Sequence, residues 1–299
     1  MKGLCEDICR FLQDQGFDCT LRNECGMRVI YISTHGDETM VILPVETSAA
    51  TIELAADQAR SLGKRLMGHT GNISNDMKAR PIIITEDRWK SNNEMMRARL
   101  LAHLKDFTQI YARNCEVRKI DKKTAAGFLE AFHSYGDASC RHRYGLFLRR
   151  HTGHNAEDRR YIGELIAVAT FSNGRRWIKG DKTIRSYEWT RYASLPQMRI
   201  SGGMGKLLKA FIADVDPDDI MTYADLEWSE GKVYEQLGFT LEGRKEPVAF
   251  VIDTLTWRRV PASKSMSACT DDISSGRTHL RYYINPGSNK YRLKLTDYQ

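Results

Sequence analysis

The chain has 299 residues, of which 41% are hydrophobic and 28% are charged, and its formal net charge at pH 7 is +7. This length can hold two domains, each with its own core, and the composition is that of an ordinary globular protein. No apolar run approaches the length of a membrane span, and residues 1–6 show no signal-peptide core, so we expect a cytoplasmic protein without membrane contact.

The cysteines indicate a reducing compartment, because the seven of them are odd in number and show no framework spacing. Four lie near the start, at Cys5, Cys9, Cys19 and Cys25, which raises the alternative of a zinc site. Cys5 and Cys9 fall on the apolar face of an expected helix, and the spacing is not Cys-x-x-Cys. We therefore expect buried thiols and no metal site.

The first hundred residues predict an α/β unit, placed here at residues 1–107. The expected elements are a helix at 4–15, strands at 27–33 and 39–45, a helix at 51–67, a strand at 81–85 and a helix at 89–104. Residues 68–78 are expected to form a polar loop.

The segment Ile82–Lys90, followed by Arg99 and Leu100, resembles the closing segment of the Vsr-like nuclease domain in certain phage homing-endonuclease-like proteins. The resemblance implies metal-assisted cleavage, which needs hard oxygen ligands and an acid or base. Glu46 is the candidate acid and Asp37 the candidate second ligand. The downstream Trp-His pair is missing, and no lysine stands two residues after Glu46. We therefore expect a nuclease-like domain that is inactive.

A second domain is expected at residues 108–260, with a linker and tail strands at 261–299. Its predicted elements are a helix at 124–132 that ends at His133, strands at 144–148, 165–171 and 187–193, a helix at 207–212 and a strand at 220–225. The segment 263–278 is Ser-rich and polar, and tail strands are expected at 279–284 and 290–295.

A glycine-rich turn, Arg199–Lys206, leads directly into the apolar helix Leu207–Ile212. Free N–H groups and the positive end of the helix dipole converge at such a turn, and glycines let a phosphate approach the backbone. A P-loop is excluded because Ile200 and Leu207 occupy its two end positions. A dinucleotide fold would place this turn after its first strand. We also expect a bulky side chain at Gly203 to block the phosphate while leaving the fold intact.

Two motifs resemble those of the GNAT (Gcn5-related N-acetyltransferase) superfamily. Arg199-x-x-Gly202-Gly203-x-Gly205 is similar to its pyrophosphate loop, and Tyr234-x-x-x-Gly238-Phe239 is similar to its second signature. The resemblance implies an α/β fold with a mixed sheet flanked by helices, and acetyl-CoA or another acyl-CoA as cofactor. The residues that it implies for cofactor binding are Arg199, Ser201, Gly202, Gly203, Gly205 and Lys206.

Acyl transfer from a thioester needs an anchored pyrophosphate, a base for the nucleophile and an acid for the departing thiolate. Tyr234 is the acid by its position in the signature, or else a packed aromatic. Glu188 lies in mid-strand, where a bare carboxylate is costly, and it is either functional or paired with Arg191. Asp225 ends a strand, where it can react or cap the following helix.

His133, Asp225 and Tyr234 also resemble the His, Asp and Tyr on which phage Mom-type enzymes, GNAT-like proteins that modify adenine in DNA, are thought to depend. Asp225 and Tyr234 match in order, and His133 matches approximately. The resemblance implies DNA as the acceptor. A histidine at a helix end is alternatively a cap.

Arginines cluster outside the first hundred residues, and Arg141, Arg143, Arg175 and Arg176 are the candidate nucleic-acid contacts. Such clusters favour a polyanionic partner, with DNA the first candidate, over a merely solvated basic surface. Three functions stay open. They are acyl-CoA-dependent transfer to an amino group, a DNA-binding module without acyl chemistry, and a metal-dependent nuclease that uses Glu46 and Asp37.

Overall fold

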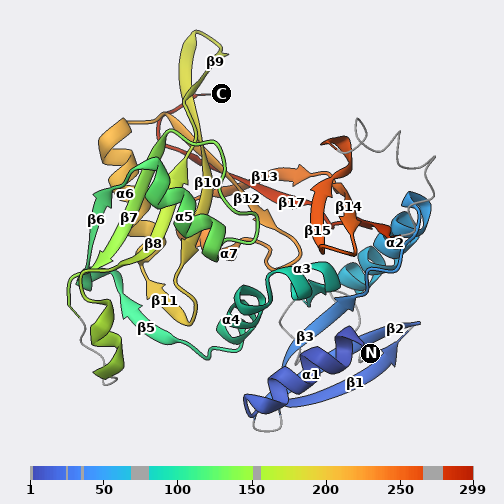
Figure 1. Cartoon of the computed structure of the whole chain (residues 1–299). Helices are drawn as coiled ribbons and strands as arrows, with labels where there is room; N and C mark the ends of the chain where they lie inside the picture. The colour runs from blue at the N-terminus through green and yellow to red at the C-terminus, as the bar shows by residue number, and fades with distance from the viewer. Residues whose placement is uncertain are drawn as a thin grey trace. The chain divides into compact units, whose positions relative to one another are not determined.

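The computed structural model describes residues 3–24, 26–34, 37–68, 81–150, 156–264 and 279–298. The chain forms two compact units that interleave along the sequence (Figure 1). Unit 1 holds Met1–Asn93, Ala224–Glu230 and Arg244–Asn289, and unit 2 holds Glu94–Tyr223, Gly231–Gly243 and Lys290–Gln299. These units do not coincide with the contiguous segments 1–107, 108–260 and 261–299 expected from the sequence. Most of the expected polar segments at 68–78 and 263–278 lies outside the described residues.

Unit 1 is built on two small sheets. Its elements are α1 (Leu4–Asp14), β1 (Asp18–Glu24), β2 (Met27–Thr34), β3 (Asp37–Val45), α2 (Ile52–Gly68), β4 (Ile82–Thr85), α3 (Glu86–Ser91), β14 (Ala249–Asp253), β15 (Arg258–Pro261) and β16 (Leu280–Ile284). Strands β1, β2 and β3 are antiparallel neighbours, and β4 joins β3 in parallel. Strand β14 lies between β15 and β16.

The core of unit 1 joins residues that are far apart in the sequence. Leu62 and Leu66 of α2, Ile83 of β4, and Phe250 and Tyr283 of the β14–β16 sheet share one buried cluster. In α1 the apolar side chains recur at helical spacing and are buried together with Cys5. Burial raises the pKa of the Cys5 thiol to about 11. This agrees with the prediction of a buried thiol at Cys5, whereas Cys9 and Cys19 are only half-buried.

Unit 2 is built on one large mixed sheet. Its elements are α4 (Asn93–His103), β5 (Thr108–Tyr111), β6 (Cys115–Lys119), α5 (Lys122–Phe132), β7 (His142–Leu148), β8 (Leu165–Phe171), β9 (Arg175–Lys179), β10 (Lys182–Ser194), β11 (Met198–Ser201), α6 (Gly203–Val215), β12 (Asp219–Asp225), α7 (Lys232–Gln236), β13 (Thr240–Lys245) and β17 (Ser288–Lys294). The strand order is β13-β17-β12-β10-β8-β7-β6, with β9 paired to β10. Strands β10 and β12 are parallel, whereas β6, β7, β8 and β10 alternate in direction.

Helices cover both faces of this sheet. Strand β8 is a nearly continuous buried apolar run, as expected for a strand with neighbours on each face. Phe171 at its end stacks on Phe211 of α6, with ring centroids 3.9 Å apart. Val168 of β8 packs instead with Leu129 of α5. Because successive strand residues point to opposite faces, α5 and α6 lie on opposite sides of the sheet. The α/β class with mixed sheets flanked by helices is therefore confirmed.

In the described part of the chain, no helix is long and apolar enough to cross a membrane.

A buried charge cluster lies inside unit 1. Arg259 donates from Nε and Nη2 to the two carboxylate oxygens of Asp87, at 2.7 and 2.8 Å, and from Nη1 to Glu227 Oε1 at 3.3 Å. Its guanidinium also lies over the rings of Phe250 and Tyr283. The three charged side chains are exposed by 7%, 1% and 1% respectively. Such a cluster tolerates the loss of a partner poorly, because the remaining charges stay buried.

We expect Arg259→Met to lower the free energy of unfolding of unit 1 by about 3–5 kcal/mol, since Asp87 and Glu227 would be left without their shared partner. The matched control is Arg258→Met at the exposed neighbouring position, which should change stability by less than about 0.5 kcal/mol. Urea unfolding followed by circular dichroism measures both variants. Equal stabilities of the two variants would contradict the assignment.

Candidate functional site

The glycine turn forms an open helix start. Strand β11 ends at Ser201, and Gly202 adopts the left-handed conformation (φ +76°) that a residue without Cβ takes easily. The first helical hydrogen bond runs from Lys206 N to Gly202 O, at 3.0 Å. The N–H groups of Gly203, Met204 and Gly205 therefore precede the first helical donor, the N–H of Lys206, and no side chain caps them. This is the backbone geometry of an anion site.

Gly203 is needed for packing as well as for access. A Cβ at this position would lie 2.8 Å from Cγ2 and 3.0 Å from Cβ of Ile200, which is buried. At Gly205 the nearest atom would be Leu237 Cδ2, at 3.2 Å. The expectation that a bulky residue at Gly203 would leave the fold intact is therefore wrong, since it would push α6 away from β11.

The side chains of Lys206, Ser201 and Arg199 in the turn differ in what they contact. Lys206 Nζ donates to the carbonyl oxygens of Ala112 (2.9 Å) and Cys115 (2.5 Å). The ammonium group that was predicted to bind the cofactor therefore holds α6 to the turn between β5 and β6. Ser201 Oγ accepts a hydrogen bond from Gln109 Nε2 at 3.0 Å. Arg199 is exposed, with its guanidinium 5.4 Å from the centroid of the Phe107 ring. Arg199 is the cation of the turn that is available to a ligand.

Glu188 lies where β10 and β12 run together. Their parallel pairing covers Ser186–Glu188 and Asp219–Met221, and a bulge follows in β10 between Trp189 and Arg191. The guanidinium of Arg191 donates to the carbonyl oxygens of Gly136 and Thr190. Within the described part of unit 2, no ion pair joins Arg191 to Glu188. The half-buried carboxylate of Glu188 instead borders a small cavity of about 50 Å³.

Tyr234, on α7, belongs to an aromatic cluster. Its ring is T-shaped to Trp189, with centroids 6.2 Å apart, and also contacts Phe239 and Tyr291. Burial raises the pKa of the Tyr234 hydroxyl, and a hydrogen bond with Thr222 opposes this shift. The phenol is therefore protonated at neutral pH, which a general acid requires. The ring lies against Trp189, the residue after Glu188 on β10, and since strand residues alternate, the Glu188 side chain points to the opposite face of that strand.

Asp225 and His133 both hold backbone turns. Asp225 Oδ1 accepts a hydrogen bond from the Glu227 N–H at 3.0 Å, and the Asp225 carbonyl accepts from Trp228 and Ser229. His133 follows the last residue of α5, and its Nδ1 accepts from the Tyr135 N–H at 3.1 Å. Asp225 belongs to unit 1, whereas His133, Glu188 and Tyr234 belong to unit 2. Their joint catalytic role remains a prediction.

The predicted DNA contacts also differ from one another. Arg143 donates to the carbonyl oxygens of Cys140 and Arg141, which makes it part of the turn before β7. Arg141 is exposed and is joined through its N–H to Phe171 at the end of β8. Arg175 and Arg176 are exposed on β9.

The two candidate metal ligands of the nuclease hypothesis lie at opposite ends of one strand. Asp37 begins β3, and Glu46 follows its last residue. Nine residues of extended strand separate the two by about 30 Å, so they cannot share a metal ion. Glu46 borders a cavity of about 520 Å³ together with Arg28 and Asp57. Across the described ranges, no group of three His, Cys, Asp or Glu residues could hold a metal ion.

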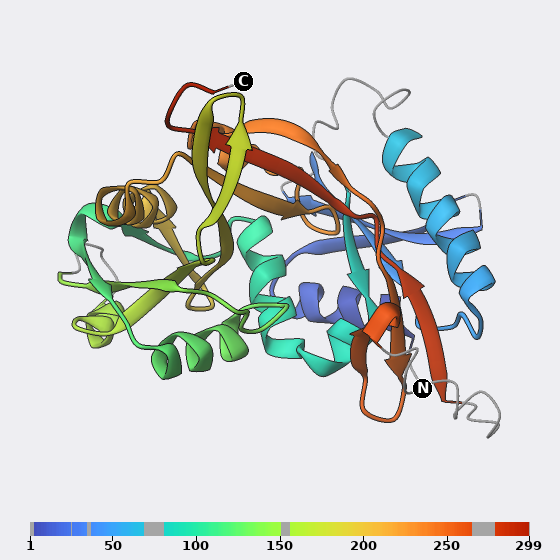
Figure 2. The same cartoon turned by 90° about the horizontal axis from the view of Figure 1, so that it is seen from above.

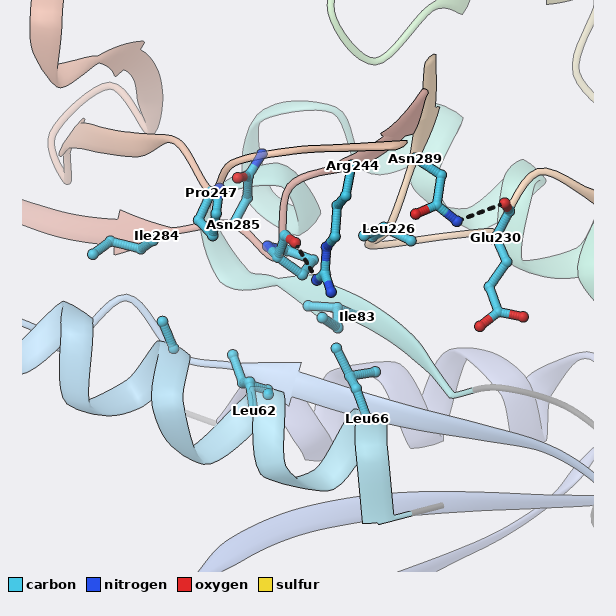
Figure 3. Close-up of a pocket in the computed structure, with 13 residues that line it drawn as sticks. Leu62, Leu66, Ile83, Leu226, Glu230, Arg244, Pro247, Ile284, Asn285 and Asn289 are labelled. Atoms are coloured by element: carbon cyan, nitrogen blue, oxygen red, sulfur yellow. Dashed lines mark hydrogen bonds between the residues drawn. The ribbon is translucent and has the colours of Figure 1, made fainter. Parts of the chain in front are cut away.

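Unit 1 also holds a cavity of about 300 Å³ that the sequence did not indicate (Figure 3). Leu62, Leu66 and Ile83 form an apolar side, as the close-up shows. Arg244 lines the cavity and donates to the Pro286 carbonyl oxygen at 2.8 Å. The lining comes from five separate stretches of the chain, so no local motif could have predicted it.

Neither a scan of protein-family models nor a search of curated proteins found a match. Several solved structures are similar to parts of the chain. Eis1 from Mycobacterium abscessus is 16% identical over 47% of this chain and 34% of its own, with a TM-score of 0.33. The NatC complex bound to Gag peptide and CoA is 14% identical over 61% and 99%, with a TM-score of 0.34. A GNAT-family acetyltransferase from Bacillus anthracis is 12% identical over 60% and 95%, with a TM-score of 0.30. At this level of similarity the neighbours do not assign a function.

We expect Gly203→Ala to lower the free energy of unfolding of unit 2 by about 1–3 kcal/mol, because its Cβ would overlap Ile200. The matched control is Gly127→Ala in α5, where no atom lies within 4 Å of the added Cβ. That change should stabilise the unit by about 0.5–1 kcal/mol through helix propensity. Thermal and urea unfolding compare the variants, and stabilisation by both would show that α6 can move away from Ile200 without cost.

Proposed function

We propose that unit 2 is an acyl-CoA-dependent N-acyltransferase that moves an acyl group from a thioester to an amino group. The observation that carries the proposal is the uncapped start of α6, with its left-handed glycine and the N–H groups of Gly203, Met204 and Gly205. A helix of this length presents the equivalent of about half a positive charge at its start. The pyrophosphate of coenzyme A fits such a site, and Arg199 supplies a full positive charge on the strand that leads into the turn.

The acyl-CoA would supply an activated thioester carbonyl, and the chain would supply the positioning and the proton transfers. Tyr234 holds its proton at neutral pH, because the ordinary pKa of a tyrosine hydroxyl is about 10 and burial raises it further, and this proton would pass to the departing sulfur. Glu188 is half-buried on β10, and its carboxylate would accept a proton from the acceptor amine.

The sharpest test separates the phosphate site from the fold. We expect Met204→Glu to abolish coenzyme A binding, because a carboxylate at the helix start repels the pyrophosphate. The same charge interacts favourably with the helix dipole, so the melting temperature should be unchanged or higher. Met204→Gln is the matched neutral control and should bind coenzyme A like the parent in calorimetry. Equal coenzyme A affinity of the Glu and Gln variants would show that the start of α6 does not bind the phosphate.

A second test concerns the acid. Tyr234→Phe should lower kcat by about 10²–10⁴-fold at unchanged coenzyme A affinity, since only the proton donor is lost. The assay is the release of free coenzyme A thiol from acetyl-CoA with spermidine as the acyl acceptor. Tyr291→Phe, which removes a hydroxyl bonded to Glu235 in the same aromatic cluster, is the control and should stay close to the parent. Parent-like kcat in Tyr234→Phe would leave Tyr234 as a packing residue.

The second candidate function is a DNA-binding module without acyl chemistry. It is supported by the exposed arginines of β9, which suit a polyanion. It is also supported by Lys206, because its ammonium group binds a backbone carbonyl oxygen of the chain instead of a cofactor phosphate. The Mom-type resemblance belongs to the acyltransferase proposal, where it would make adenine in DNA the acceptor, and both candidate functions place the protein in the cytoplasm. In both, unit 1 is a nuclease-like scaffold that does not cut DNA. Coenzyme A binding distinguishes the two functions, because the binding module would show none.

A further inference from the structure

Strand β9 and the first residues of β10 form a two-stranded ribbon that extends from the large sheet of unit 2 (Figures 1 and 2). The register runs from Arg175 opposite Ser186 to Lys179 opposite Lys182, and Gly180 and Asp181 make the turn. All five residues of β9 are exposed. Because the β9 side chains bury little surface, core packing does not explain why these residues are there.

The ribbon is strongly basic. Its residues 175–185 include five cations (Arg175, Arg176, Lys179, Lys182 and Arg185) and one acid, Asp181. The register sets Lys179 against Lys182 and Arg176 against Arg185, and like charges directly opposite each other destabilise a strand pair.

Within the described residues, carboxylates lie within 4 Å of only one of these five cations, Arg185 of β10. Arg185 lies 3.6 Å from carboxylate oxygens of Asp216 and Asp218, and Lys182 donates to the Asp297 carbonyl oxygen. Arg175, Arg176 and Lys179 form no ion pair within the described residues. The β9 side therefore keeps an uncompensated positive charge, which is complementary to a polyanion.

Two large apolar side chains interrupt this basic strand. Trp177 is 53% exposed and Ile178 is 82% exposed. Because side chains alternate along a strand, Trp177 shares one face with Arg175 and Lys179, each about 7 Å away along the strand, and Ile178 faces the other way. Ile184, opposite Trp177, is buried, whereas about half of the Trp177 side chain is open to solvent. The result is a flat aromatic surface between two cations.

We propose that this face of the ribbon binds single-stranded nucleic acid, with a base stacked on Trp177 and phosphates held by Arg175 and Lys179. Base–aromatic stacking combined with a basic track is the usual basis of single-strand binding without sequence preference. A lipid surface fits less well, because the apex of the ribbon, Lys179–Lys182, is charged and the apolar side chains lie behind it. The inference specifies the partner of the second candidate function and does not depend on acyl transfer.

Tryptophan fluorescence reports on this face directly. Trp89, Trp189 and Trp228 are at most 3% exposed. The ring of Trp257 is covered by Lys90, whose Nζ lies 3.8 Å from the ring centroid. Titration of the full chain with oligothymidylate of about 20 nucleotides should quench the emission of Trp177. The quench should be lost in Trp177→Phe, while this variant, which retains a flat ring, binds within a few-fold of the parent.

The variants separate stacking from charge. Trp177→Ala should bind the oligonucleotide about tenfold more weakly, whereas Ile178→Ala, on the opposite face of the same strand, should bind like the parent. Replacing both Arg175 and Lys179 with Gln should reduce the slope of log K against log salt by about 1.4. Melting temperatures check that each variant is folded.

Three outcomes would overturn the proposal. They are parent-like binding by Trp177→Ala, tighter binding of a duplex of equal length than of the single strand, and binding of anionic phospholipid vesicles in preference to the oligonucleotide. Coenzyme A titration of Trp177→Ala distinguishes this inference from the proposed acyltransferase function. The ribbon variant should keep its coenzyme A affinity, and Met204→Glu should keep its oligonucleotide affinity.

Discussion

The large sheet of unit 2 depends on Arg292, which joins four strands through one guanidinium. From β17 it donates to both carboxylate oxygens of Glu242 on β13, at 2.7 and 3.1 Å, and to Asp219 Oδ1 on β12 at 2.8 Å. It also reaches Ser186 Oγ on β10, at 3.4 Å. Bidentate arginine–carboxylate pairs fix orientation as well as adding energy. This pairing lowers the pKa of Glu242 to about 2, so its stabilising charge is present above the carboxyl group's unfolded value of 4.5 and is lost only as the pH falls toward 2.

The position of β17 has a direct consequence for the candidate site. Strand β12 is held between β17 and β10, and its pairing with β10 spans only Ser186–Glu188. Beyond that point β10 has its bulge, and the Thr222 hydroxyl on β12 donates to the Trp189 carbonyl. Thr222 also contacts the Tyr234 hydroxyl. The residues proposed for proton transfer are therefore placed by a strand that comes from the far end of the chain.

Local patterns predicted the local features well. The glycine turn before α6, the continuous apolar run of β8 and the amphipathic face of α1 follow from short-range periodicity and backbone chemistry, and each is present. The insertion of β17 between β12 and β13 could not be predicted, because strand pairing over such separations leaves no local periodic signal. Lys206 shows the same limit at the level of one side chain. Its position in the motif indicated a ligand, but the carbonyl oxygens that it contacts belong to a turn about ninety residues earlier.

The position of Asp225 is explained by the buried charge cluster of unit 1. The segment Ala224–Glu230 continues from β12 and contributes Glu227 to the cluster around Arg259. Burial raises the pKa of Glu227, the negative charge of Asp225 raises it further, and the positive charges of Arg259 and Arg88 oppose both effects. The Asp225 carboxylate also holds the Glu227 N–H, which fixes the turn that presents Glu227 to Arg259. A carboxylate at the end of a strand is often a reacting group in an α/β protein, but here its position is explained by the turn and the ion cluster that follow it.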